Sequence, residues 1–189
     1  MTDMIYGEYA DYLPLILEDF SQRIRKKNDE VKKETGYKLF EHFIARVKTS
    51  ESMTEKCQRK NLPVCGFVDD IYTLVDLIRS FDDCTIVAEK DYIKNAKPNG
   101  YRSYHLIVEV VTPYPDCLGN KHGSYFIEIQ LRTIAMDSWA SLEHQMKYKH
   151  DIKDPKRIVR ELKRCADELA SCDLTMQTIR NLIQESSQD

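Results

Sequence analysis

A basic loop that runs into a strand carries the side chains of this sequence best suited to chemistry. Residues 90–100 hold three lysines among asparagine, proline and glycine residues, which predict an exposed turn. Residues 101–111 are rich in aromatic and β-branched types, which predict a strand that anchors the exit of the loop. A cationic loop on a rigid sheet suits a polyphosphate ligand, because its lysines can neutralise charge that the sheet alone cannot.

A second polar surface is predicted on the strand at residues 124–132. Glu128, Gln130 and Arg132 alternate with aliphatic residues there, so all three share one face of the strand. An ordinary amphipathic strand would also explain this alternation. The functional interpretation gains from Ser103 and His105, which the neighbouring strand should bring to the same edge. An acid, an amide and an arginine facing a cationic loop predict a metal and phosphate site.

Single side chains in these segments have ordinary interpretations too. His105 could be a strand histidine with a satisfied hydrogen bond, and Tyr101 could pack within the turn, although its flat ring also suits stacking on a nucleobase. A second polar group follows one side of the helix predicted at residues 37–60. Its members are Arg46, Lys48, Ser52 and Lys56. A solvated helix face is the alternative interpretation of this group.

The elements that must position these residues follow an α+β pattern. Apolar spacing and capping residues predict helices over residues 8–35, 37–60, 69–80, 134–148 and 154–184. Strands are predicted over residues 84–89, 104–111 and 124–132, the last two as an antiparallel hairpin. Long helices on both sides of strands indicate a single α+β domain with a mixed sheet and flanking helices.

The chain near Pro63 does not fit this pattern. Residues 64–67 look like the end of a strand that has no beginning, and the acidic start of a helix follows at once. Either this connection is unusually abrupt or a segment that the fold needs is absent.

Composition limits the classes of protein and of partner. The 189 residues suffice for one core, and the formal net charge of −3 gives no argument for nucleic acid. A local basic cluster, Arg23, Arg25, Lys26 and Lys27, leaves an RNA partner open, with a solvated helix face as the alternative. Six cysteines without a CxxC pair favour free thiols in a reducing compartment. Since no signal peptide or apolar run of membrane length occurs, we expect a soluble cytoplasmic protein without membrane contact.

Four motifs in this sequence resemble the synthetase domain of the RelA/SpoT proteins, in the single-domain form called small alarmone synthetases. They are RVKTSESMTEK, FVDDIYTLVDLI, KPNGYRSYHLIV and EIQLRTIAMDSWASLEHQMKYK. They occur in the order of the family. The resemblance implies the nucleotidyltransferase-like fold of these synthetases, with a core at residues 37–150, an N-terminal helix at residues 1–36 and a C-terminal helical extension at residues 151–189.

The same resemblance implies an ATP-dependent pyrophosphokinase. Such an enzyme moves the β,γ-pyrophosphate of ATP onto the 3′-hydroxyl of GDP or GTP, giving (p)ppGpp, with magnesium (Mg2+) as cofactor. Some small relatives are toxins that instead pyrophosphorylate the 3′ CCA end of tRNA or make adenine alarmones, and the basic N-terminal cluster would suit RNA. The terminal helices could form a homo-oligomer, cover their own domain or receive an antitoxin. A possible seam for a partner is the heptad repeat of Leu162, Leu169, Met176 and Ile183.

Site residues follow from the resemblance position by position. Glu128 matches the catalytic carboxylate, which binds magnesium and helps to deprotonate the attacking hydroxyl. The residues that match the ATP side are Arg46, Lys48, Ser52, Lys56 and Lys90. The residues that match the acceptor side are Lys97, Asn99, Tyr101, His105, Gln130, Arg132 and Ala135. Arg46 is expected to stack on adenine, and Tyr101 on the base of the acceptor.

One departure from the family concerns the metal. The family carries a DxxGxR segment before its FVDDIY-like helix, and the aspartate of that segment is the main magnesium ligand. Here the chain passes directly from Pro63 to Val64 where this segment should be, so about twenty residues with a second carboxylate are missing. We interpret the gap as a disordered segment left out of this sequence. A true deletion is the alternative, and it would favour an inactive nucleotide- or RNA-binding relative.

Overall fold

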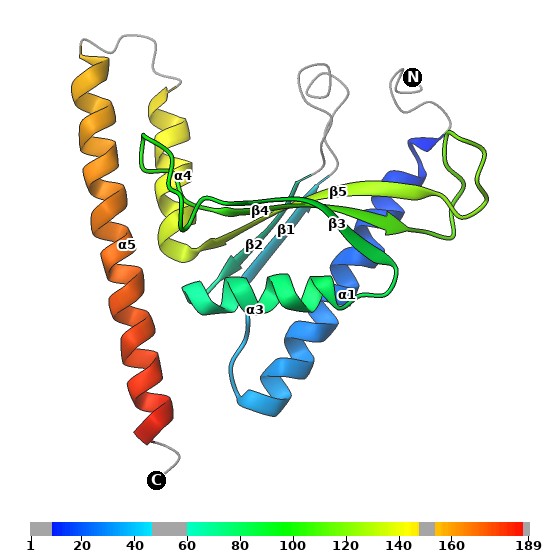
Figure 1. The fold of residues 1–189 in the computed structure, drawn as a ribbon, viewed down its shortest axis with the longest axis horizontal. Coiled ribbons are helices and arrows are strands. Elements are labelled where there is room, and N and C mark those ends of the chain that lie inside the picture. The colour runs from blue at the N-terminus through cyan, green and yellow to red at the C-terminus, as the bar shows by residue number, and fades with distance from the viewer. Residues whose placement is uncertain (1–8, 47–59, 148–153, 187–189) are drawn as a thin grey trace.

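A five-stranded sheet organises the residues that the computed structural model describes, which are 9–46, 60–147 and 154–186 (Figure 1). The strands are β1 (His42–Arg46), β2 (Lys60–Cys65), β3 (Cys84–Asp91), β4 (Tyr104–Val111) and β5 (Ser124–Thr133), in the spatial order β1-β2-β5-β4-β3. The helices are α1 (Tyr12–Thr35), α3 (Val68–Arg79), α4 (Ile134–Lys147) and α5 (Pro155–Ser186). Because β2 runs parallel to β5 and the other neighbours are antiparallel, the sheet is mixed, which confirms the α+β prediction.

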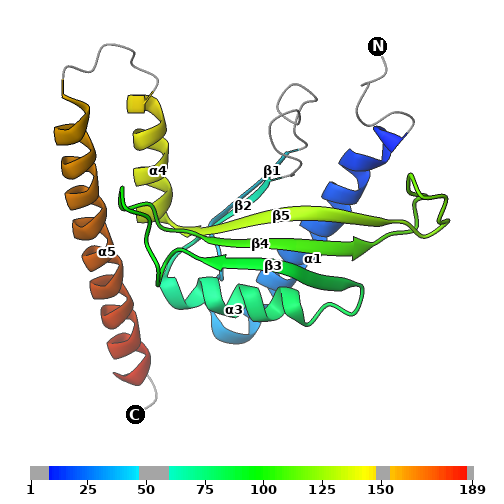
Figure 2. The ribbon, with the colours of Figure 1, turned by 45° about the horizontal axis from the view of Figure 1, so that its top comes forward.

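The core lies between one face of the sheet and the helices α1 and α3, which lie on the same side of it (Figure 2). Leu106 and Val108 of β4 and Ile127 and Ile129 of β5 are fully buried there. They meet apolar stripes of the two helices, whose spacing of three and four residues was visible in the sequence. The alternate residues of β4 and β5 face the other side of the sheet, and that side carries the polar groups.

The predicted helix at residues 37–60 is wrong where the structure describes it. Residues 42–46 are extended and form β1, which pairs antiparallel with β2 from His42 opposite Val64 to Arg46 opposite Lys60. A short apolar pattern fits a helical period and a strand period about equally well, and the deciding interaction here is a partner strand far along the chain. The expected helical face that begins at Arg46 is therefore not formed at that residue.

The strand that had no visible beginning starts at Lys60. β2 runs through Pro63 and Val64 without a break and occupies the position between β1 and β5. The chain as it stands thus forms a complete strand at this place, with Lys60 opposite Glu128 in the register to β5. The six residues of β2, KNLPVC, include no acid, so this strand does not supply the second carboxylate that the family pattern places nearby.

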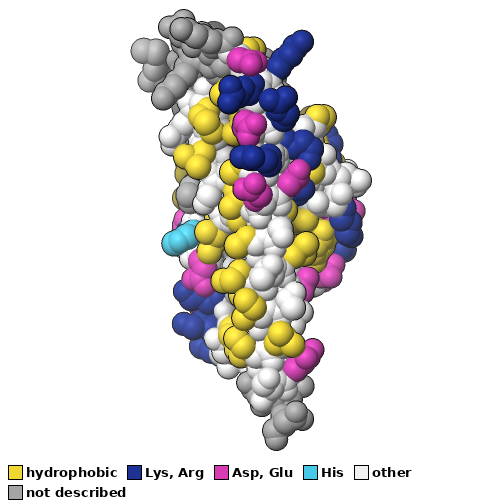
Figure 3. All heavy atoms as spheres, turned by 90° about the vertical axis from the view of Figure 1, so that its left-hand side faces the viewer, with side chains coloured by type: hydrophobic (Ala, Val, Ile, Leu, Met, Phe, Trp, Pro, Cys, Tyr) yellow, Lys and Arg dark blue, Asp and Glu magenta, His cyan; other side chains and the backbone are white. Residues whose placement is uncertain are grey.

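The long helix α5 lies beside α4 and reaches past the end of the sheet (Figure 1). Two of the four heptad residues, Leu162 and Leu169, are half-buried against the rest of the chain, whereas Met176 and Ile183 are more than half exposed. The first half of the predicted seam therefore packs within the chain, and only its second half remains exposed. Apolar side chains follow much of the outer side of α5 (Figure 3). Among the described residues, no helix is both long and apolar enough to cross a bilayer.

Candidate functional site

The polar residues of β4 and β5 form rows across the sheet, on the face away from α1 and α3. Lys90 of β3 lies opposite His105 of β4, which lies opposite Gln130 of β5. The next row has Glu128 of β5 opposite Lys60 of β2, and Lys60 in turn lies opposite Arg46 of β1. Antiparallel and parallel pairing thus bring residues of all five strands into these two rows. The predicted orientation of Glu128 and Gln130, away from the core, is confirmed by the full burial of their aliphatic neighbours on the opposite face.

Glu128 lies at the centre of a hydrogen-bond network. Its Oε1 accepts from Gln130 Nε2 at 2.9 Å and lies 3.7 Å from His105 Nδ1. Its Oε2 is buried and has no hydrogen-bond partner among the residues that the structure describes. An unpartnered buried carboxylate oxygen is costly, and a cation or a polar hydrogen from a ligand would satisfy it. The carboxylate is therefore suited to hold a metal ion or to receive a proton.

Tyr101 connects the basic loop to this network. Its hydroxyl accepts from Arg132 Nη2 at 3.0 Å and lies 2.9 Å from His105 Nε2. The hydroxyl can donate its own hydrogen to the Nε2 of a His105 protonated on Nδ1, and in that tautomer the Nδ1 hydrogen lies on the side of Glu128, 3.7 Å from Oε1. Two cations also lie near the ring of Tyr101, with Lys97 Nζ 4.8 Å and the Arg132 guanidinium 5.4 Å from its centroid.

The basic loop is held by its own side chains. Asp91 accepts hydrogen bonds from the backbone N–H groups of Ile93 and Lys94, each at 2.9 Å, which starts the turn. Asn99 accepts from the backbone N–H of Tyr101 at 3.2 Å and donates to Glu143 of α4 at 3.1 Å. Asn99, predicted to face a nucleotide, thus ties the loop to α4 in this structure.

Two neighbours of the site were not among the predicted residues. Asp137, in the first turn of α4, accepts from Arg132 Nη1 at 2.9 Å and orients the guanidinium. Tyr92 lies edge-on to His105, with centroids 5.3 Å apart, and Lys97 Nζ lies 4.6 Å from its ring centroid. The sequence did contain a signal for Asp137, because an acid in the first turn of the helix that follows the polar strand can reach an arginine at the end of that strand. Nothing in the spacing of Tyr92 distinguished it from the other tyrosines.

The predicted ATP side is only partly described. Arg46 is the last residue of β1, in the same row of the sheet as Glu128, and nothing is described of its side chain. Lys48, Ser52 and Lys56 lie outside the described residues. Lys90 is exposed at the end of β3, two strands from Gln130.

Ala135, predicted on the acceptor side, is the second residue of α4 and lines a small cavity with Gly100 and Trp139. It therefore lies behind the loop that carries Tyr101. The structure places the other predicted acceptor residues around Tyr101, either on the loop or on the polar face of β4 and β5.

The basic cluster of α1 is largely occupied by contacts within the chain. Arg23 donates to Asp83 at 2.7 Å and lies over the ring of Phe81. Arg25 lies over the ring of Phe43 and 3.6 Å from Glu18, and Lys27 pairs with Glu30 at 2.7 Å. Burial acts to raise the pKa of Asp83, but the hydrogen bonds and charge of Arg23 outweigh it and hold that pKa below its ordinary value. These contacts give the cluster a structural role. Lys26, the fourth predicted RNA-binding residue, is exposed.

The comparisons with known proteins agree with this geometry. The family described as "Region found in RelA / SpoT proteins" matches residues 45–153. GTP pyrophosphokinase YwaC of Bacillus subtilis is 41% identical over 150 residues, 70% of each chain.

Two solved structures of small alarmone synthetase 1 from Bacillus subtilis resemble the fold. The structure with its product pppGpp has a TM-score of 0.79 at 28% identity, and the one with AMPCPP has 0.71 at 26%. Each match covers 92% of this chain and 96% of the other. This chain therefore belongs to the RelA/SpoT synthetase family.

Proposed function

We propose that this chain is an ATP-dependent pyrophosphokinase that transfers the β,γ-pyrophosphate of ATP to the 3′-hydroxyl of GDP or GTP, giving (p)ppGpp. The observation that carries the proposal is the buried, unpartnered Oε2 of Glu128 beside the Tyr101 and His105 network. Relatives named GTP pyrophosphokinase, and a relative solved with pppGpp, support the guanine acceptor.

The proposed reaction is an in-line displacement at phosphorus. The 3′-hydroxyl oxygen forms a bond to the β-phosphorus of ATP while the bond from that phosphorus to the α,β-bridging oxygen breaks, and AMP leaves with that oxygen. The hydroxyl proton passes to Oε2 of Glu128, which Gln130 orients by holding Oε1 at 2.9 Å. Because Oε2 is buried and has no described partner, it lacks a competing hydrogen bond that would weaken it as a base.

The acceptor base is proposed to stack on Tyr101. The ring is fixed by hydrogen bonds of its hydroxyl to His105 and Arg132, so little side-chain entropy remains to be lost on binding. Lys97 and Arg132, which lie within 5.4 Å of the ring centroid, supply positive charge for the phosphates of the acceptor. On the donor side, Lys90 and the row that contains Arg46 are proposed to bind ATP.

The residues present fit a magnesium ion at Glu128. A carboxylate is a ligand that Mg2+ prefers, and the two oxygens of Glu128 together keep lone pairs for the ion beside the hydrogen bond from Gln130 and the proton that Oε2 receives. When bound, Mg2+ would offset the negative charge of the triphosphate. No group of three or more metal-binding side chains is found among the described residues, so substrate phosphates and water would complete the coordination.

The proposal is tested by supplying ATP labelled in its β- and γ-phosphates with either GDP or deacylated tRNA. We expect label in a product of GDP and none in tRNA, because Arg23, Arg25 and Lys27 are engaged within the chain. Glu128→Gln keeps the size and the hydrogen bond to Gln130 but removes the base, and should lower transfer by about 100-fold or more. If only the tRNA gains label, the acceptor is tRNA and not a guanine nucleotide. Binding of GDP without transfer by the wild type would indicate an inactive relative.

A further inference from the structure

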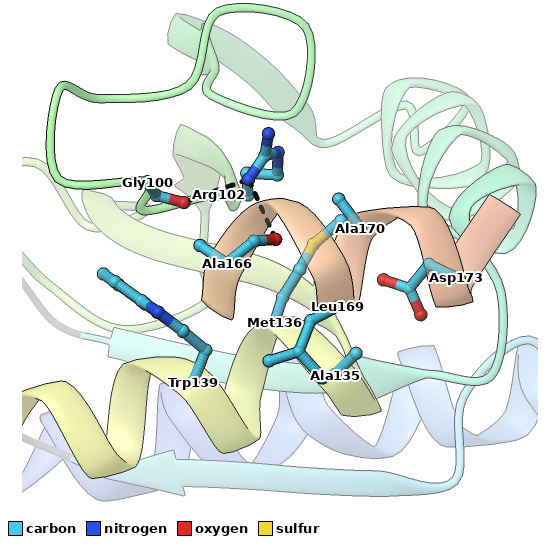
Figure 4. Close-up of a pocket in the computed structure, with 9 residues that line it drawn as sticks. All are labelled: Gly100, Arg102, Ala135, Met136, Trp139, Ala166, Leu169, Ala170 and Asp173. Carbon is cyan, nitrogen blue, oxygen red and sulfur yellow. Dashed lines mark hydrogen bonds between the residues drawn. The ribbon is translucent and has the colours of Figure 1, made fainter. Parts of the chain in front are cut away.

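The helix α5 contacts the loop that carries Tyr101 through Arg102 (Figure 4). Arg102 Nη1 donates to the carbonyl oxygens of Gly100 at 3.3 Å and of Ala166 at 3.2 Å. Its Nη2 donates to Asp167 Oδ1 at 2.9 Å, and only 19% of its side chain is exposed. One guanidinium therefore joins the residue before Tyr101 to two consecutive residues of α5.

Gly100, the residue before Tyr101, also contacts this turn of α5 directly through its backbone. Gly100 has a φ of +91°, and a Cβ placed on it would lie 2.6 Å from the Cβ of Ala166 and 3.2 Å from the Cα of Lys163. No side chain fits there. The cavity between the loop, α4 and α5 has a volume of only about 10 Å³, enough for a single water molecule at most. Because loop and helix are in direct contact, the loop cannot shift toward α5 without moving the helix.

A second contact connects α5 with the surroundings of the Tyr101 ring. The indole Nε1 of Trp139, on α4, donates to the carbonyl oxygen of Leu162 in α5 at 2.9 Å. The Trp139 ring is buried and its centroid lies 6.4 Å from that of Tyr101. Both the backbone and the ring environment of Tyr101 thus depend on one stretch of α5, residues 162–167.

We propose that this stretch of α5 positions Tyr101 for the acceptor and that Arg102 is the positioning residue that transmits its influence. Arg102 acts through the backbone of its neighbour, because its guanidinium is committed to α5 rather than to a substrate. Loss of the contact leaves the ring of Tyr101 chemically intact but free to move. Acceptor binding must then order the ring, and this loss of conformational entropy weakens binding relative to the wild type. This inference rests on the proposed function, in which Tyr101 binds the acceptor.

The test separates the KM values of the two substrates. Arg102→Gln removes the bonds to α5 and should raise the KM for GDP about five- to tenfold, with kcat and the KM for ATP changed less than about twofold. Lys163→Gln is the matched control, because Lys163 donates to the other oxygen of the same carboxylate, Asp167 Oδ2, at 2.6 Å. It removes one positive charge from the same carboxylate within α5 and leaves the bonds of Arg102 and the backbone contact with Gly100 in place, so both KM values should stay at the wild-type level.

The single tryptophan of the chain gives a readout that does not require turnover. Arg102→Gln should shift Trp139 emission to longer wavelength, and a GDP titration followed by that emission should show weaker binding by the same factor as the change in KM. Lys163→Gln should change neither. Melting curves of all three proteins check that the fold is retained, and Arg102→Lys, which keeps the charge, should lie between wild type and Arg102→Gln.

The possible failures are distinguishable. If product forms and Arg102→Gln leaves the KM for GDP unchanged, or raises both KM values equally, the positioning role is wrong while the proposed function stands. If the wild type neither forms product nor binds GDP, the proposed function is wrong and this inference is wrong with it.

Discussion

Tyr101 combines two separable contributions, its ring and its hydroxyl. The ring is proposed to stack on the acceptor base, whereas the hydroxyl bonds to His105 and Arg132. Tyr101→Ala should lower kcat/KM for transfer to GDP by about 100-fold, the value of a base–aromatic stack. Tyr101→Phe keeps the ring and should cost less than about tenfold. Equal losses in the two variants, measured by steady-state kinetics, would assign the main role to the hydroxyl.

At the scale of residues, the sequence predicted which side chains share a face but not how they pair. The alternation of Glu128, Gln130 and Arg132 follows directly from the period of a strand, and their burial and contacts agree with it. The partner of Arg132, Asp137, depends on how α4 leaves β5, and the link from Asn99 to Glu143 joins residues 44 apart. Such pairings depend on the packing of separate elements, which local patterns do not contain.

At the scale of elements, the contact between the loop and α5 predicts unequal effects of the same substitution at two glycines. Gly100 and Gly119 have φ values of +91° and +85°, so an alanine is strained by about 1–2 kcal/mol at either position. Only at Gly100 would the new Cβ also meet a neighbour, whereas nothing lies within 4 Å of a Cβ at Gly119. Overpacking should add about 1–3 kcal/mol to the loss in the free energy of unfolding for Gly100→Ala.

Urea unfolding of the two alanine variants measures this difference, with Gly119→Ala as the control for backbone strain. Similar losses of stability would mean that the loop and α5 separate easily, contrary to the close contact between Gly100 and Ala166.

Most elements followed from the sequence because their patterns are local. The helix ending at Gly36, the hairpin of β4 and β5, and the long helix from Pro155 all agree with the predictions. The segment at residues 42–46 did not, because its conformation is decided by pairing with β2. β2 itself was recognised only in part, since Pro63 interrupts the usual signature of a strand.

At the scale of the whole molecule, Asp173 of α5 joins the last helix to the end of the sheet. Thr133, the final residue of β5, donates to Asp173 Oδ2 at 2.6 Å. Burial raises the pKa of Asp173 above its ordinary value, and the hydrogen bond from Thr133 opposes this only in part. A carboxyl group with a raised pKa binds its proton more tightly in the folded state, so its contribution to stability declines as pH rises through the window above the ordinary pKa.

Asp173→Asn should therefore stabilise the protein at pH 7, because the amide carries no charge and its oxygen can still accept from Thr133. We expect a Tm higher by about 2 °C at pH 7, with the advantage lost near pH 4, where the wild-type carboxyl is protonated. Asp82→Asn, at an exposed position, serves as the control and should show no such pH dependence. A lower Tm for Asp173→Asn at pH 7 would mean that the ionised carboxylate stabilises the fold.

Further contacts fix the far part of α5 on α3. Arg180 donates to Asp70 at 2.6 Å and lies over the ring of Phe67, and Gln177 accepts from the backbone N–H of Asp69. The apolar residues that remain exposed on α5 are the place where the predicted second copy or antitoxin would bind, and that association stays a prediction. Which of them bind a partner could not be read from the heptad alone, because the same repeat serves the chain's own packing.

The outer strand of the sheet has a consequence for aggregation. β3 lies at the margin of the sheet, and its register to β4 shifts between Ile86 and Ala88, which marks a bulge. A foreign strand that tried to extend the sheet along β3 would lose regular pairing at this irregularity and would then meet Glu89 and Lys90. This margin is therefore protected against amyloid-like growth.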